Sequence, residues 1–215
     1  MAINLNKITL EKQGDSHKID LSKGGDNISK EIVINLNWTQ RAGLWAKLTS
    51  NAVDLDLGVW YELKDSSKSC IDGLQFAHGN GGTKNQVSKQ GSYAQKPWIW
   101  HSGDDRSGSA GDGENILINP QGLSDLKRII VYCFIYEGAA KWTETNAVVT
   151  VKVPGNPEIV VEMGKQYSSQ KFCAIAEIVF DSNSMTVKKL VTFHNGHGDC
   201  DKAYSWNMQW RAGSK

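Results

Sequence analysis

The 215-residue sequence has only 4 prolines, no excess of either charge and no long apolar run. Its 24 Lys and Arg are balanced by 23 Asp and Glu, which argues against a dedicated nucleic-acid binder, since that class usually carries a basic excess. The longest apolar run, IIVYCFIY, is far shorter than the roughly 20 residues of a transmembrane helix. The opening residues MAINLNKITL lack the features of a signal peptide. We therefore expect a cytoplasmic protein with no transmembrane segment, while peripheral association with a membrane stays open.

Cysteine motifs and catalytic motifs are also missing. The four cysteines, at positions 70, 133, 173 and 200, form no CxxC pair of the kind found in redox or zinc-ribbon proteins. Cys133 and Cys173 lie inside apolar runs, which predicts reduced thiols in the core. The sequence contains no GxSxG, no HExxH and no GxxxxGK[ST] phosphate loop. No catalytic constellation stands out, so we expect a protein that is not an enzyme.

Glycine and tryptophan, by contrast, are abundant, with 21 and 8 residues. Short runs rich in Val, Ile, Thr and aromatic residues alternate with period two, as in residues 31–38, 53–63 and 128–137, and Gly, Asn or Asp bounds them. This pattern predicts an all-β fold, an antiparallel two-sheet β-sandwich with short helical turns, as a single domain over residues 1–215. Residues 181–184 are expected to form a hairpin turn, and Leu123–Ile129 to form one or two helical turns.

The most informative stretch is HSGDDRSGSAGDGENILI, residues 101–118, in which four glycines alternate with carboxylates. Carboxylates this close together repel one another unless a cation neutralises them, and glycines let the backbone wrap so that carbonyls also point inward. Calcium needs about 6–8 oxygen ligands in a flexible shell, and this loop can supply them. Magnesium, which demands a stricter octahedral geometry, fits the loop less well. The alternative is a solvated surface turn. The candidate ligands are Asp104, Asp105, Asp112 and Glu114.

A second acidic pair, Asp54 and Asp56, lies upstream on one face of an expected strand, because side chains at i and i+2 point the same way. The pair lies either on a solvated outer face or, if that face meets the acidic loop, on one rim of a cation site. HNGHGDC, residues 194–200, offers His194, His197 and Cys200 as further metal ligands, with a polar turn as the alternative. Trp98 and Trp100 immediately precede the acidic loop and are expected to brace it.

Several ordered blocks resemble one known family. Residues 22–38, 53–63, 102–114 and 128–138 are similar to the tellurium-resistance TerD-domain family, and the second half of the chain resembles its TerA-like members. In the acidic loop, Gly103-Asp104-Asp105, Ser107-Gly108 and Gly111-Asp112-Gly113 match the family's G-D-N-L-T-G-x-G-D-G pattern, while Asp54 and Asp56 match its D-x-D strand.

The resemblance implies a β-sandwich that binds one or two Ca²⁺ ions. It also implies a cytosolic bacterial stress protein that works with other proteins of a tellurium-resistance system. One departure supports an alternative: the acidic run after Gly113 is reduced to Glu114-Asn115, which favours a protein-interaction scaffold with a weakened or vestigial calcium site. A third hypothesis is a metal-dependent hydrolase built on the same carboxylates.

Overall fold

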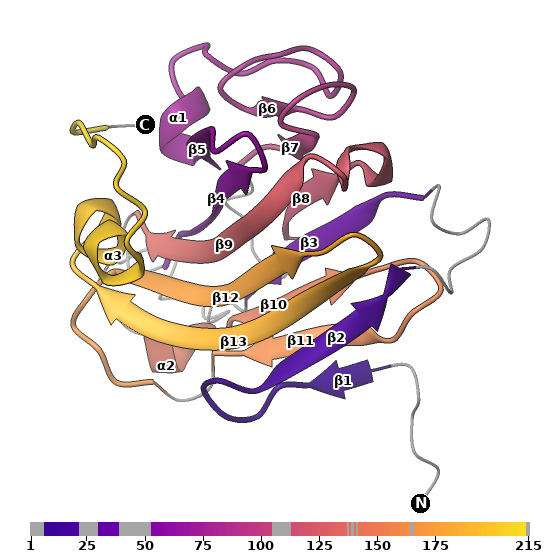
Figure 1. Cartoon of the computed structure of the whole chain (residues 1–215). Coiled ribbons are helices and arrows are strands. Elements are labelled where there is room, and N and C mark those ends of the chain that lie inside the picture. Colours follow the sequence, from indigo (N-terminus) through magenta and orange to yellow (C-terminus); the bar gives the residue numbers. More distant parts are fainter. Residues whose placement is uncertain are drawn as a thin grey trace, which may run out of the picture.

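The computed structural model describes residues 7–21, 30–38, 53–104, 113–136, 138, 140, 142–163 and 166–213. Two β-sheets pack face to face, accompanied by a few short helices (Figure 1). The expected all-β, two-sheet fold is therefore confirmed. Over the described residues, no helix has the length and apolar character needed to cross a membrane.

One sheet, as far as the described residues go, has seven strands. They are β1 (Lys7–Thr9), β3 (Ile32–Asn37), β6 (Gly91–Ser92), β7 (Ile99–His101), β8 (Glu114–Ile118), β10 (Val148–Lys152) and β11 (Glu158–Glu162). Their order is β1-β11-β10-β3-β8-β7-β6. All neighbouring strands are antiparallel except β1 and β11, which are parallel.

The other sheet has six strands within the same described ranges. They are β2 (Ser16–Asp20), β4 (Leu55–Leu63), β5 (Lys68–Asp72), β9 (Leu126–Ile135), β12 (Phe172–Phe180) and β13 (Ser184–His194). Their order is β2-β13-β12-β9-β4-β5, and every pair is antiparallel. The hairpin between β12 and β13 turns at residues 181–183, as the sequence predicts.

The helices are short: α1 (Gly73–Phe76), α2 (Trp142–Thr145), α3 (His197–Tyr204) and the 3₁₀ turn η3 (Pro120–Gly122). The helical turns expected over Leu123–Ile129 are wrong beyond the first three residues, because β9 already begins at Leu126. The strand prevails because Leu126 pairs with Leu63 of β4 and Ile129 is buried in the core.

Strand β9 shows why the central run of the sequence is continuously apolar. Its residues alternate between two buried environments: Ile129, Val131 and Cys133 face the core between the sheets, whereas Ile130 and Tyr132 belong to a second cluster. The thiols of Cys133 and Cys173 are free and buried, as expected. A strand that is covered on both faces needs no polar alternation.

The second cluster lies on the face of the six-stranded sheet that is turned away from the seven-stranded sheet. Helix α3 and the C-terminal segment after it lie on this face (Figure 1), and Cys200 and Trp206 contribute buried side chains to it. Gly58 on β4 makes room for this layer, since a Cβ there would lie 2.4 Å from the ring of Tyr132. The six-stranded sheet is therefore sandwiched between two apolar layers.

Candidate metal centre

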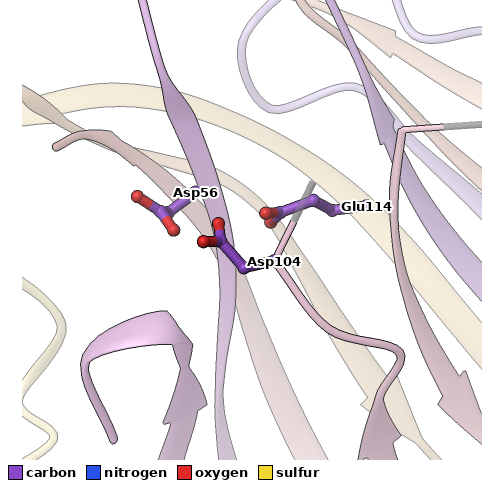
Figure 2. A group of neighbouring side chains, drawn as sticks. All are labelled: Asp56, Asp104 and Glu114. Carbon is purple, nitrogen blue, oxygen red and sulfur yellow. The ribbon is translucent and has the colours of Figure 1, made fainter. Parts of the chain in front are cut away.

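Three carboxylates meet at one end of the two sheets. Asp56 comes from β4 of the six-stranded sheet, Glu114 from the start of β8 in the seven-stranded sheet, and Asp104 from the segment after β7. Each has a carboxylate oxygen within 4.8 Å of those of the other two. Figure 2 shows the three carboxylate groups close together, with that of Asp104 between the other two. We call this group the acidic junction.

Glu114 reaches the junction because β8 directs it inward. Glu114, Ile116 and Ile118 are the buried residues of β8, and Glu114 pairs with Leu36 of β3. Its Oε2 accepts a hydrogen bond of 2.6 Å from the backbone N–H of Leu57, across the gap between the sheets. The preceding residue must be glycine: Gly113 has φ +70°, and a Cβ there would lie 2.1 Å from the carbonyl oxygen of Leu36.

His101, at the end of β7, holds the same backbone from the other side. Its Nε2 lies 3.1 Å from the carbonyl oxygen of Leu57, and its Nδ1 accepts a 3.1 Å hydrogen bond from the N–H of Gly103. Since Nδ1 is an acceptor, Nε2 carries the ring proton and donates to Leu57. The same Nε2 also lies 3.6 Å from Oε2 of Glu114.

The burial of the three carboxylates is uneven. Asp56 and Glu114 are each 1% exposed, whereas Asp104 is exposed to solvent. Burial, together with the nearby charges of Glu114 and Asp56, raises the pKa of the Cys133 thiol well above its usual range. Buried anions this close together favour a bound cation, and a set made only of carboxylate oxygens suits a hard ion such as Ca²⁺. The exposed Asp104 leaves the junction accessible from solvent.

The other predicted ligands, Asp54, Asp105 and Asp112, do not belong to the acidic junction as the structure describes it. Asp54 is 9% exposed and lies two residues before Asp56, but it is not part of the acidic junction. The alternative that Asp54 and Asp56 lie on a solvated outer face is wrong, because both are buried. Asp105 and Asp112 lie outside the described residues.

The alternative ligands near the C-terminus do not gather into a site. His197 contacts Asp72, with Nε2 at 2.9 Å from Oδ2, whereas Nδ1 of His194 lies 4.0 Å from Asp199. Cys200 is buried in the second apolar cluster, where burial raises the pKa of its thiol. The segment also forms α3 rather than only a polar turn. Within the described part of the chain, the acidic junction alone has the geometry of a metal site.

Asp72 and Asp201 are buried carboxylates of the outer layer. Asp72 is fully buried and accepts hydrogen bonds from the N–H groups of Leu74 and Gln75, from the hydroxyl of Tyr132 and from His197. Asp201 of α3 accepts from the N–H groups of Asn207 and Met208 and from the indole of Trp210, at 2.8–2.9 Å. These carboxylates fasten α1 and the C-terminal segment to the sheet.

The sequence alone indicates no role for His101. The indole of Trp98, expected to brace the acidic loop together with Trp100, donates to Asp125 at 2.8 Å, and most of that loop lies outside the described residues. A local signal for His101 exists, since it shares the buried face of β7 with the apolar Ile99. A histidine on a buried strand face, two residues before the Gly103-Asp104 turn, is the pattern to look for.

The comparisons with known proteins give a consistent result. No model of a protein family matches the sequence. The chain is 34% identical over 218 aligned residues to the tellurium resistance protein TerA of Alcaligenes sp., an alignment that covers 99% of this chain and 60% of that protein. The chain therefore spans about three fifths of the length of this curated relative.

The fold has a solved counterpart. The crystal structure of a homologue of the telluride resistance protein TerD from Streptomyces coelicolor A3(2) superposes with a TM-score of 0.54, over 80% of this chain and 94% of that one. At 15% identity, this likeness shows a shared fold. The similarity to TerA over nearly the whole chain, together with the fold shared with the TerD homologue, supports the resemblance to TerD/TerA-like proteins that the sequence motifs indicate.

Proposed function

We propose that this protein is a non-enzymatic calcium-binding protein of a bacterial stress-response system that confers resistance to tellurite. The observation that carries the proposal is the acidic junction, in which Asp56, Asp104 and Glu114 bring carboxylate oxygens within 4.8 Å of one another. Two of these side chains are almost completely buried, where bringing several negative charges together is costly.

The donor set fits calcium. Ca²⁺ takes oxygen ligands, tolerates irregular geometry and accepts mixtures of carboxylates, carbonyls and water. The described residues supply three carboxylates, and Asp105 and Asp112 remain predicted as additional ligands for one or two ions. Bound calcium would neutralise the junction and hold together two sheets that contribute ligands from β4, β8 and the segment after β7.

The biological setting is proposed from the relatives. TerA and TerD carry tellurium or telluride resistance in their names, so we propose a role in the same type of system, in the cytoplasm and together with other proteins of that system. Because this chain spans only part of the length of TerA, the activity and partners of the longer protein belong to the proposal as well.

Calorimetric titration of the chelator-treated protein with CaCl₂, accompanied by thermal unfolding, tests the proposal. We expect saturable binding, and at a free calcium concentration of 100 times Kd a gain of about 2.7 kcal/mol in the free energy of unfolding. The D104N variant should lose both effects, because Asp104 is exposed and its loss removes a ligand without disturbing the core. D181N, at an exposed hairpin turn, is the matched control and should bind normally.

The competing functions give different results. Absence of both heat and stabilisation at millimolar calcium would refute calcium binding and favour the interaction scaffold. Partner recovery that is the same with and without chelator would point the same way. Calcium-dependent hydrolysis of phosphoesters that is lost in D104N would instead support the hydrolase.

A further inference from the structure

We propose that His101 is a positioning residue for the cation site: it holds the segment carrying Asp104 against the strand carrying Asp56, so that the three carboxylates converge. This inference rests on the proposed calcium function and adds a residue that is not itself a ligand. It starts from the position of the imidazole, which lies between two segments that each deliver one carboxylate.

The first link joins the two sheets. In β4, Leu57 follows Asp56 directly, and the pairing between β4 and β5 ends at Gly58, one residue later. Beyond that point, two side chains take the place of β5 as hydrogen-bond partners of the β4 backbone. His101 donates to the carbonyl oxygen of Leu57 at 3.1 Å, and Glu114 accepts from the N–H of Leu57 at 2.6 Å. Both polar groups of Leu57 are thereby bound to the seven-stranded sheet, and Asp56 is fixed beside them.

The second link fixes the segment after β7. Nδ1 of His101 accepts a hydrogen bond from the N–H of Gly103 at 3.1 Å, and Asp104 is the next residue. Gly103 has φ +121°, a conformation that few residues other than glycine adopt. One side chain thus sets the backbone next to Asp104 and the backbone next to Asp56.

The imidazole can act as a rigid spacer because its own position is strongly determined. The backbone of His101 makes two hydrogen bonds with Gln90. The N–H of His101 donates to the carbonyl oxygen of Gln90 at 3.1 Å, and the side-chain amide of Gln90 donates to the carbonyl oxygen of His101 at 2.7 Å. The ring packs against Phe76 of α1, with centroids 5.1 Å apart, and the side chain is 1% exposed. Groups that orient metal ligands from behind typically change metal affinity by about 10- to 100-fold when they are removed.

Two substitutions separate the links. In H101Q the amide nitrogen can still reach the Leu57 carbonyl, but no acceptor remains for Gly103; in H101N the side-chain oxygen can still accept from Gly103, but nothing reaches Leu57. We expect each variant to raise the calcium Kd about tenfold or more in calorimetric titration, measured at a temperature where the variant is fully folded. Y132F is the control, because it removes a buried hydrogen bond in the outer layer and should lower the thermal midpoint without changing the calcium Kd.

The outcomes distinguish the inference from the proposed function. If the unsubstituted protein takes up no calcium, the proposed function fails and the inference fails with it. If it binds calcium but H101Q and H101N bind within twofold of its Kd, only the inference fails, and His101 merely stabilises the fold. The inference is supported if the calcium Kd is higher in both variants than in the unsubstituted protein. Both chelator-treated variants must also be folded, with circular dichroism that matches that of the unsubstituted chain.

Discussion

Asp72 and Glu114 are both almost completely buried, yet their surroundings differ. Asp72 receives four donors: two backbone N–H groups at the start of α1, the hydroxyl of Tyr132 and the ring of His197. Glu114 receives the N–H of Leu57, but the carboxylate oxygens of Asp56 and Asp104 also lie within 4.8 Å of it. Burial of a carboxylate therefore does not mark a binding site by itself. What distinguishes Glu114 is that it lies beside two further carboxylates, whereas Asp72 lies beside a histidine and a tyrosine hydroxyl.

Among the substitutions that test this difference between Asp72 and Glu114, we expect D72A to have the largest effect on the free energy of unfolding. The substitution removes the cap of α1 and leaves the half-buried His197 and the buried hydroxyl of Tyr132 without this acceptor. We expect the free energy of unfolding to fall by about 3–5 kcal/mol, equally in calcium and in chelator, because the outer layer already satisfies its own charges. Urea unfolding monitored by tryptophan fluorescence measures it, with D181A at the exposed turn as the control. A loss that depends on calcium would contradict the separation of the two regions.

Much of the fold could be predicted because local patterns carry it. The run over residues 128–137 is apolar and β-branched, and it forms most of β9; the Asp-Ser-Asn-Ser segment makes the expected hairpin turn. Leu123–Ile129 could be predicted less well, because its local helical signal is weak and pairing with β4 prevails from Leu126 onward. The secondary-structure propensity of a few residues does not reflect pairing with a strand about 60 positions away in the sequence.

The site could be predicted only in part, for a similar reason. The clustering of Asp104 and Glu114 follows from the sequence of the loop, and the i, i+2 rule places Asp54 and Asp56 on one strand face. Only the tertiary structure decides that Asp56 joins the acidic junction. The pairing of His197 with Asp72 spans 125 positions and had no local signal. His101 was missed because its partners are backbone groups, which look alike at every position of a sequence.

A smaller effect is expected from reversing one charge in the acidic junction. Asp104 is exposed, so a lysine at this position has space to extend, and its ammonium would lie near Asp56 and Glu114 in place of a third anion. We expect D104K to be more stable than the unsubstituted protein in chelator, by on the order of 1 kcal/mol, and to gain nothing further from calcium. Thermal and urea unfolding with and without calcium measure this, and D181K is the control. A less stable D104K in chelator would show that the three carboxylates do not repel one another.

The smallest effect is a pH dependence confined to acidic conditions. Burial alone raises the pKa of Asp72, but the hydrogen bond and charge of His197, followed by the Tyr132 hydroxyl and the Gln75 N–H, outweigh it and hold this pKa below its ordinary value. A lowered native pKa means that Asp72 stabilises the fold fully above its unfolded pKa of about 4, and that this contribution is lost as the pH falls through the native value.

We therefore expect the difference in unfolding free energy between the unsubstituted protein and D72N to be constant from pH 6 to about pH 4 and to shrink below it. Urea unfolding in chelator at a series of pH values measures the difference. Glu62 acts in the same direction, because Lys127 and Arg128 lower its pKa against the effect of burial, but it is present in both proteins and cancels from the difference. A difference that stayed constant down to pH 3 would mean that Asp72 is not held as an anion by its donors, and the contrast with the acidic junction would then lose its electrostatic basis.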